Sequence, residues 1–114
     1  MKIWKMAVKI PEECMNGDCY EVSGRYMMDK HLAGLSNPVL VHGTVTGQGR
    51  IHGVEYDHAW IEEGDEVLDM SRSRNIHMPK AVYYALGQIK NTKKYDYETF
   101  RKMVSKYKHW GPWE

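Results

Sequence analysis

The spacing of hydrophobic and polar positions changes along the chain from a helical period to a period of two, and then back again. Apolar residues recur at helical spacing from Cys19 to about His31, which predicts a helix that ends near Gly34. Helical spacing returns over Pro79–Ile89 and over about Asp96–His109. The predicted helix over Pro79–Ile89 is expected to bury one apolar face, made of Val82, Ala85, Leu86 and Ile89. The last is expected to bury a stripe made of Tyr97, Phe100, Val104 and Tyr107.

Between the first two predicted helices the residues favour strands. The β-branched stretch PVLVHGTVTG predicts one strand, and GVEYDHAWIEEGDEVLDM predicts two more that turn at Glu63 and Gly64. A looser alternation in IWKMAVKI indicates a weak edge strand, ended by Pro11. The predicted order is a weak strand, a helix, three antiparallel strands and two C-terminal helices. This is an α+β pattern, with the first helix packed on a small antiparallel sheet.

Length and composition narrow the class of protein. The chain has 114 residues, enough for one domain, and we interpret 1–114 as a single domain. The formal net charge of +1 makes nucleic acid an unexpected partner, and no apolar run is long enough to span a membrane. The start of the chain does not have the pattern of a signal peptide. We therefore expect Cys14 and Cys19 to be thiols in the cytoplasm.

The segment from His58 to Ser71 brings a histidine and an aspartate into register. With Glu63 and Gly64 as the turn, His58 lies directly opposite Asp69. Residues opposite each other on antiparallel strands have Cβ atoms roughly 4.5–5.5 Å apart and share a face of the sheet. A carboxylate at that distance fixes the orientation of an imidazole and stabilises its charged form. The hairpin therefore predicts a histidine–aspartate dyad.

Cys19 is the candidate nucleophile for this dyad. Asp18 is a suitable N-cap, and Glu21 completes a capping-box pattern three residues later. Cys19 is then the first helical residue, where backbone N–H groups and the helix dipole favour a thiolate. A neighbouring imidazolium lowers the pKa of such a thiol further, which produces the thiolate–imidazolium pair that acyl-transfer enzymes use.

A cysteine that opens a helix, a histidine in HAW on a strand and an aspartate on the next strand together resemble the papain-like and transglutaminase-like superfamily. The matching segments are DCYEVS with Cys19, HAWIEE with His58 and EVLDMS with Asp69, within residues 14–71. The resemblance implies a papain-like or transglutaminase-like core and thiol-based acyl transfer. Cys19 would attack a carbonyl carbon, His58 would transfer the proton, and Asp69 would orient His58.

The reaction implied by the resemblance is hydrolysis or transfer. A cysteine peptidase, amidase or deamidase resolves the acyl-enzyme with water, whereas a transglutaminase or N-acyltransferase resolves it with an amine. Hydrolysis is the first expectation because water needs no second binding site. The expected partner is a peptide, a protein or a small amide or acyl substrate.

The oxyanion site departs from the pattern of the superfamily. Many papain-like enzymes carry a glutamine shortly before the nucleophile, whereas this chain has Asn16 there and Gln48 in a glycine loop. The backbone N–H of Cys19 is the first candidate donor to the oxyanion, and Asn16 is the second. Gln48 is a further oxyanion or substrate candidate. Trp60, on the same face as His58, is expected in the core or in the wall of the substrate site.

Plainer interpretations compete with the triad. A cysteine is often a small buried hydrophobe, and His42 on the neighbouring strand is an alternative base. The cysteine and histidine spacings do not fit a zinc site, so neither a metal nor a cofactor is expected. One rival function is thiol redox chemistry by Cys14 and Cys19. Another is a non-catalytic binding or inhibitor module that exposes Trp110 and Trp113.

Overall fold

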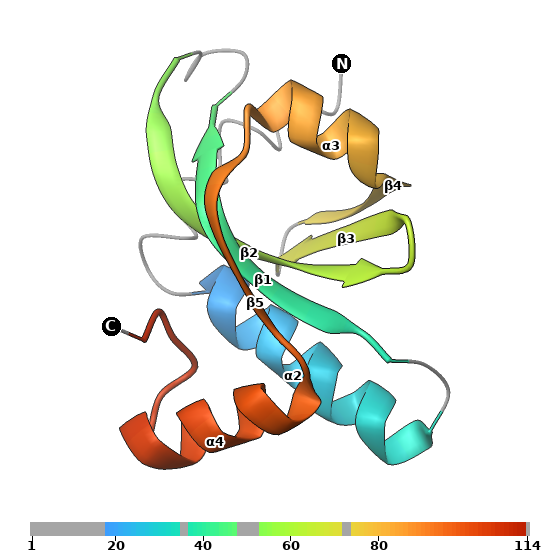
Figure 1. The fold of residues 1–114 in the computed structure, drawn as a ribbon, viewed down its shortest axis with the longest axis vertical. Coiled ribbons are helices and arrows are strands. Elements are labelled where there is room, and N and C mark those ends of the chain that lie inside the picture. The colour runs from blue at the N-terminus through green and yellow to red at the C-terminus, as the bar shows by residue number, and fades with distance from the viewer. Residues whose placement is uncertain (1–17, 35–36, 48–52, 72–73, 114) are drawn as a thin grey trace.

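The computed structural model describes residues 18–34, 37–47, 53–71 and 74–113. These residues form three helices and one antiparallel sheet of five strands (Figure 1). The elements in chain order are α2 (Asp18–Ala33), β1 (Val39–Thr46), β2 (Glu55–Glu63), β3 (Glu66–Ser71), β4 (Arg74–Pro79), α3 (Lys80–Gly87), β5 (Lys90–Tyr95) and α4 (Tyr97–Tyr107). The order of strands across the sheet is β4-β3-β2-β1-β5. The predicted α+β class is confirmed. The predicted strand in IWKMAVKI lies outside the described residues.

Side chains on both faces of the sheet are buried. One face carries Leu40, Ala59 and Ile61, which share a core with residues of α2 and α4. The other face carries Val41 and Trp60, which share a second core with α3. In Figure 1, α2 and α4 lie toward the bottom of the view and α3 toward the top. Side chains of β1 and β2 therefore alternate between two cores, as the period of two requires.

The bounds of the first and last helices are close to the predicted ones. The structure has α2 from Asp18 to Ala33, so Asp18 is its first residue and not the predicted N-cap, and the N–H of Gly34 donates to the carbonyl of Lys30 at 3.0 Å. Asp96 precedes α4, and its side chain accepts a hydrogen bond from the N–H of Thr99 at 2.8 Å. The predicted first and last helices are confirmed.

The hairpin between β2 and β3 turns one residue later than predicted, at Gly64 and Asp65. Gly64 has a φ of +60°, a conformation that favours glycine. The paired residues are Ile61 with Leu68, Glu62 with Val67 and Glu63 with Glu66. The same register, extended, places Asp69 opposite Trp60, so the predicted direct pairing of Asp69 with His58 is wrong. Because the shift is by two positions, both side chains still belong to the same face.

The two edges of the sheet, β4 and β5, are strands that the sequence pattern did not predict. In β5, KNTKKY, the first five of the six residues are exposed, so no period of two marks it. In β4, RNIHMP, the strand ends in a proline. Edge strands in natural proteins commonly carry lysine and proline, which discourage pairing with other chains. Their identity as strands therefore depends on their neighbours in the sheet.

The face that α3 buries is not the predicted one. Val82 and Leu86 are 45% and 52% exposed, whereas Tyr83 is 6% exposed. Two hydrogen bonds explain the difference, because the hydroxyl of Tyr83 donates to a carboxylate of β3 and that of Tyr84 donates to Glu62 Oε2 at 2.5 Å. The buried Tyr83 and the partly buried Tyr84, both with hydrogen-bonded hydroxyls, thus pack where the aliphatic face was predicted.

The C-terminal segment packs back against the helices. Trp113 is 2% exposed, and its indole N–H donates to the carbonyl of His109 at 2.9 Å. Trp110 is half-buried and stacks on Phe100, with ring centroids 6.5 Å apart. The expectation that the two tail tryptophans are exposed for a partner is therefore wrong, because the aromatic core of α2 and α4 takes up Trp113.

Gly24→Ala tests this packing of the tail. A Cβ at Gly24 would lie 2.5 Å from Trp110 Cε3 and 3.2 Å from Phe100 Cε1. We expect the free energy of unfolding to fall by about 1–3 kcal/mol, because the core is already filled. Urea denaturation measures it, and Trp110→Ala supplies the control background, where the same exchange should cost less. A gain of about 1 kcal/mol, typical of Gly→Ala in an open helix, would contradict the packing.

Candidate active site

The structure brings His58 and Asp69 into contact inside the protein. His58 Nε2 lies 2.9 Å from Asp69 Oδ1, and both side chains are 1% exposed. Within the described strands, the pairs between β2 and β3 end at Ile61 and Leu68. Both side chains lie beyond this last pair, and they meet diagonally across the two strands. The predicted proximity is therefore reached by a different register.

Tyr83 holds the second oxygen of Asp69. Its hydroxyl donates to Asp69 Oδ2 at 2.6 Å, in a buried contact. Each carboxylate oxygen of Asp69 thus has a partner, one from β2 and one from α3. The buried face predicted for this helix consists of aliphatic residues and does not include Tyr83. The signal that marks it is a tyrosine inside a short apolar helix, since a buried phenol needs an acceptor.

Cys19 reaches His58 from α2. It is the second residue of the helix and is 0% exposed, and it is not in a disulfide. Its side chain is hydrogen-bonded to that of His58. Because His58 Nε2 faces Asp69, Nδ1 is the ring nitrogen left for the thiol. The backbone N–H of Cys19 is one of the first four of the helix, which have no acceptor within it.

The pKa of His58 is set by burial against two partners. Burial alone lowers it, because the imidazolium loses its hydration. The charge and hydrogen bond of Asp69, followed by those of Cys19, outweigh burial and raise the pKa from 6.5 to about 9. The ring is therefore an imidazolium at neutral pH, held between a carboxylate and a thiol.

Trp60 is fully buried beside His58. The two ring centroids are 6.0 Å apart, and the indole N–H of Trp60 donates to Glu62 Oε2 at 3.2 Å. Trp60 is thus part of the core behind the imidazole. Asn16, Gln48 and Cys14 lie outside the described residues.

His42, the alternative base, is on the opposite face of the sheet from His58. It pairs across the strands with Ala59, whereas Gly43 pairs with His58. Its ring packs among three aromatic rings, with centroid distances of 4.8 Å to Tyr20, 5.0 Å to Tyr95 and 5.0 Å to Trp113. The structure thus brings His58, and not His42, to Asp69.

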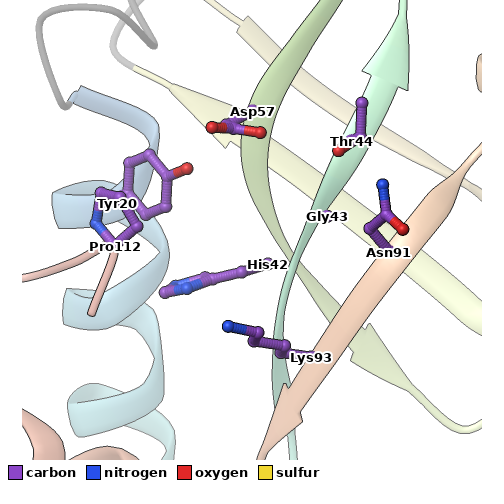
Figure 2. A pocket seen from close by; sticks show the side chains of 8 residues that line it. All are labelled: Tyr20, His42, Gly43, Thr44, Asp57, Asn91, Lys93 and Pro112. Atoms are coloured by element: carbon purple, nitrogen blue, oxygen red, sulfur yellow. The ribbon is translucent and has the colours of Figure 1, made fainter. Parts of the chain in front are cut away.

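A cavity of about 360 Å³ lies on the face of the sheet that carries His42, between α2, the sheet and the C-terminal segment (Figure 2). Its lining residues are Tyr20, His42, Gly43, Thr44, Asp57, Asn91, Lys93 and Pro112. Tyr20 follows Cys19 in the chain, and Asp57 precedes His58. The cavity is therefore lined by chain neighbours of Cys19 and His58, but not by Cys19, His58 or Asp69 themselves.

Across residues 18–34, 37–47, 53–71 and 74–113, no three His, Cys, Asp or Glu side chains are arranged to share a metal ion. The helices in this part of the chain are all too short or too polar to cross a membrane. No protein-family model, curated protein or solved structure matches the chain.

Proposed function

We propose that this protein is a thiol-dependent acyl-transfer enzyme that hydrolyses a peptide or amide bond. One observation carries the proposal, namely the buried chain of contacts from Cys19 through His58 to Asp69. A cysteine at the start of a helix, beside an imidazolium, has the two features that lower a thiol pKa and activate the sulfur.

The arrangement of elements supports the same proposal. A helix carries the cysteine and packs on β2 and β3, the strands that carry the histidine and the aspartate. The order Cys19, His58, Asp69 along the chain is that of the papain-like and transglutaminase-like superfamily. We therefore propose a papain-like or transglutaminase-like core, with a reduced set of elements around it.

In the first half of the reaction, the Cys19 thiolate attacks the carbonyl carbon of the substrate. A C–S bond forms, and the carbonyl oxygen becomes an oxyanion that accepts from the backbone N–H of Cys19, with Asn16 as the proposed second donor. The C–N bond then breaks, and the imidazolium of His58 gives its proton to the departing amine. The products of this half are a thioester and a neutral imidazole.

In the second half, water attacks the thioester carbon. Neutral His58 takes a proton from the water, a C–O bond forms and the C–S bond breaks. Cys19 leaves as a thiolate and His58 is again an imidazolium, so the starting pair is restored. Asp69 accepts a hydrogen bond from His58 throughout and keeps the ring oriented. Tyr83 in turn holds Asp69.

Substrate access requires a local opening, because Cys19 is 0% exposed. The start of α2 has to separate from its neighbours before a carbonyl group can reach the sulfur. Such opening lowers the observed rate of any reaction at Cys19 by the fraction of molecules that are open.

The pH dependence of iodoacetamide alkylation tests the proposal. We expect the rate at Cys19, separated from Cys14 by mass spectrometry, to reach its plateau well below the ordinary thiol pKa of about 8.5. In His58→Gln the rate should instead follow a pKa near 8.5, because no imidazolium stabilises the thiolate. Local opening changes the plateau rate of alkylation, but it does not change the difference in apparent pKa between the wild type and His58→Gln.

His42→Gln is the matched control, since His42 is also buried on the sheet but lies on the opposite face. Its profile should match that of the wild type. An alkylation rate at Cys19 that follows a pKa near 8.5 in the wild type, or that is unchanged in His58→Gln, would refute the catalytic proposal. The network of Cys19, His58 and Asp69 would then be a structural one, in a protein that acts by binding.

A further inference from the structure

The cavity on the His42 face of the sheet carries opposite charges at its two ends. Figure 2 shows the carboxylate of Asp57 at one end and the ammonium of Lys93 at the other, with His42 between them. Asp57 comes from β2 and Lys93 from β5, on either side of β1. Both residues are exposed, so solvent and a ligand can reach their charges.

The sheet fixes the separation of these two charges. Asp57 pairs with Thr44 on β1, and Lys93 pairs with His42, two residues earlier on the same strand. They are thus two strand spacings and two residues apart, which gives a separation of about 12 Å between Cα atoms. Three fully extended residues span at most about 11 Å, so a peptide that fits between these two residues has no more than three.

The rest of the lining suits a peptide. Thr44 and Asn91 offer a hydroxyl and a carboxamide, which hydrogen-bond to amide groups. Tyr20 and Pro112 form an aromatic and aliphatic wall on the side of α2, as Figure 2 shows. A volume of about 360 Å³ is at the small end of ligand sites, which range from about 300 to 1,000 Å³.

We propose that this cavity binds a short peptide of two or three residues through both of its charged ends, with the amino group at Asp57 and the carboxylate at Lys93. The binding does not rest on the proposed function, because it depends on residues other than Cys19, His58 and Asp69, on the opposite face of the sheet from the His58 side chain.

Calorimetric titration of the full chain carrying Cys19→Ala tests binding without turnover. The probe is alanyl-alanine, compared with N-acetyl-alanyl-alanine and alanyl-alanine amide, which each lack one charge. We expect each modification to weaken binding by about tenfold or more, the usual effect of losing a charged hydrogen bond. Free alanine and tetra-alanine measure the length preference, and both should bind more weakly than alanyl-alanine.

Two substitutions test which end of the peptide each charged residue binds. Asp57→Asn should remove the preference for a free amino group and leave the preference for a free carboxylate, and Lys93→Met should do the opposite. Glu55→Gln and Lys90→Met are the matched controls, because this pair joins the same two strands at 2.7 Å and neither residue lines the cavity. Both controls should bind like the parent protein.

The inference is overturned if alanyl-alanine does not bind at millimolar concentration, or if its modified forms bind equally well. It is also overturned if Asp57→Asn and Lys93→Met leave both preferences unchanged. These failures are separate from failure of the proposed function. If Cys19 reacts as a thiolate but no peptide binds, only the proposed peptide binding is refuted. If a peptide binds but Cys19 does not react as a thiolate, only the proposed catalysis is refuted.

Discussion

Asp69→Asn is expected to lower the free energy of unfolding by about 3–5 kcal/mol at pH 7. The substitution keeps the shape of the side chain but removes the charge that faces the buried imidazolium of His58. It also weakens the acceptor of the Tyr83 hydroxyl. A charge left without its partner in the core explains the large cost. Urea denaturation measures this loss, provided that the slope of the unfolding free energy against urea concentration is the same as in the wild type.

Asp65→Asn is the matched control, because it makes the same exchange at an exposed position of the same hairpin. Its effect should stay within about 0.5 kcal/mol. Tyr83→Phe keeps the test informative if Asp69→Asn does not fold, since it removes one hydrogen bond to Asp69 and should cost about 1–3 kcal/mol. Equal stability of Asp69→Asn and Asp65→Asn would show that the buried pair does not carry charge.

His58 is expected to keep its proton up to a pH of about 9. The pKa is raised from 6.5 because the charges and hydrogen bonds of Asp69 and Cys19 outweigh the burial that lowers it. Nuclear magnetic resonance of the imidazole as a function of pH gives this value directly. In Asp69→Asn, burial should dominate and the pKa of His58 should fall. A wild-type pKa at or below 6.5 would mean that the ring is buried in its neutral form.

The raised pKa of His58 links stability to pH. The folded protein holds a proton on His58 between pH 6.5 and about 9, and the unfolded chain does not. The contribution of His58 to the free energy of unfolding is therefore about 3 kcal/mol below pH 6.5. It is lost as the pH rises through about 9. The sign follows because the folded state binds more protons in this range, so a rise in pH favours unfolding.

Cys19→Ala separates the proton of His58 from that of the thiol. If Cys19 is a thiolate in the folded protein, the proton gained by His58 is offset by one lost from Cys19. The stability of the wild type should then fall less steeply between pH 6.5 and 8.5 than that of Cys19→Ala. Parallel curves for the two proteins would mean that the folded protein keeps a neutral thiol, and would contradict the ion pair that the proposed reaction starts from.

The sequence by itself determined the α+β class, the first and last helices and the faces of β2. Helical spacing is a local signal, so the predicted bounds of these two helices are close to the observed bounds of α2 and α4. The period of two placed His58 and Asp69 on one face. That prediction is correct although the predicted register of β2 and β3 is wrong, because a shift by two positions preserves the face of every side chain.

Only the tertiary structure decided the contacts that join distant elements. The strands β4 and β5 have no period of two, because edge strands with exposed lysines are stabilised by a neighbour in the sheet and not by their own apolar side chains. Tyr83 is buried because Asp69, fourteen residues earlier, accepts a hydrogen bond from its hydroxyl. The cavity combines residues of α2, three strands and the tail. A pattern along the chain reports which residues share a face of one element, whereas packing between elements decides which of those faces meet.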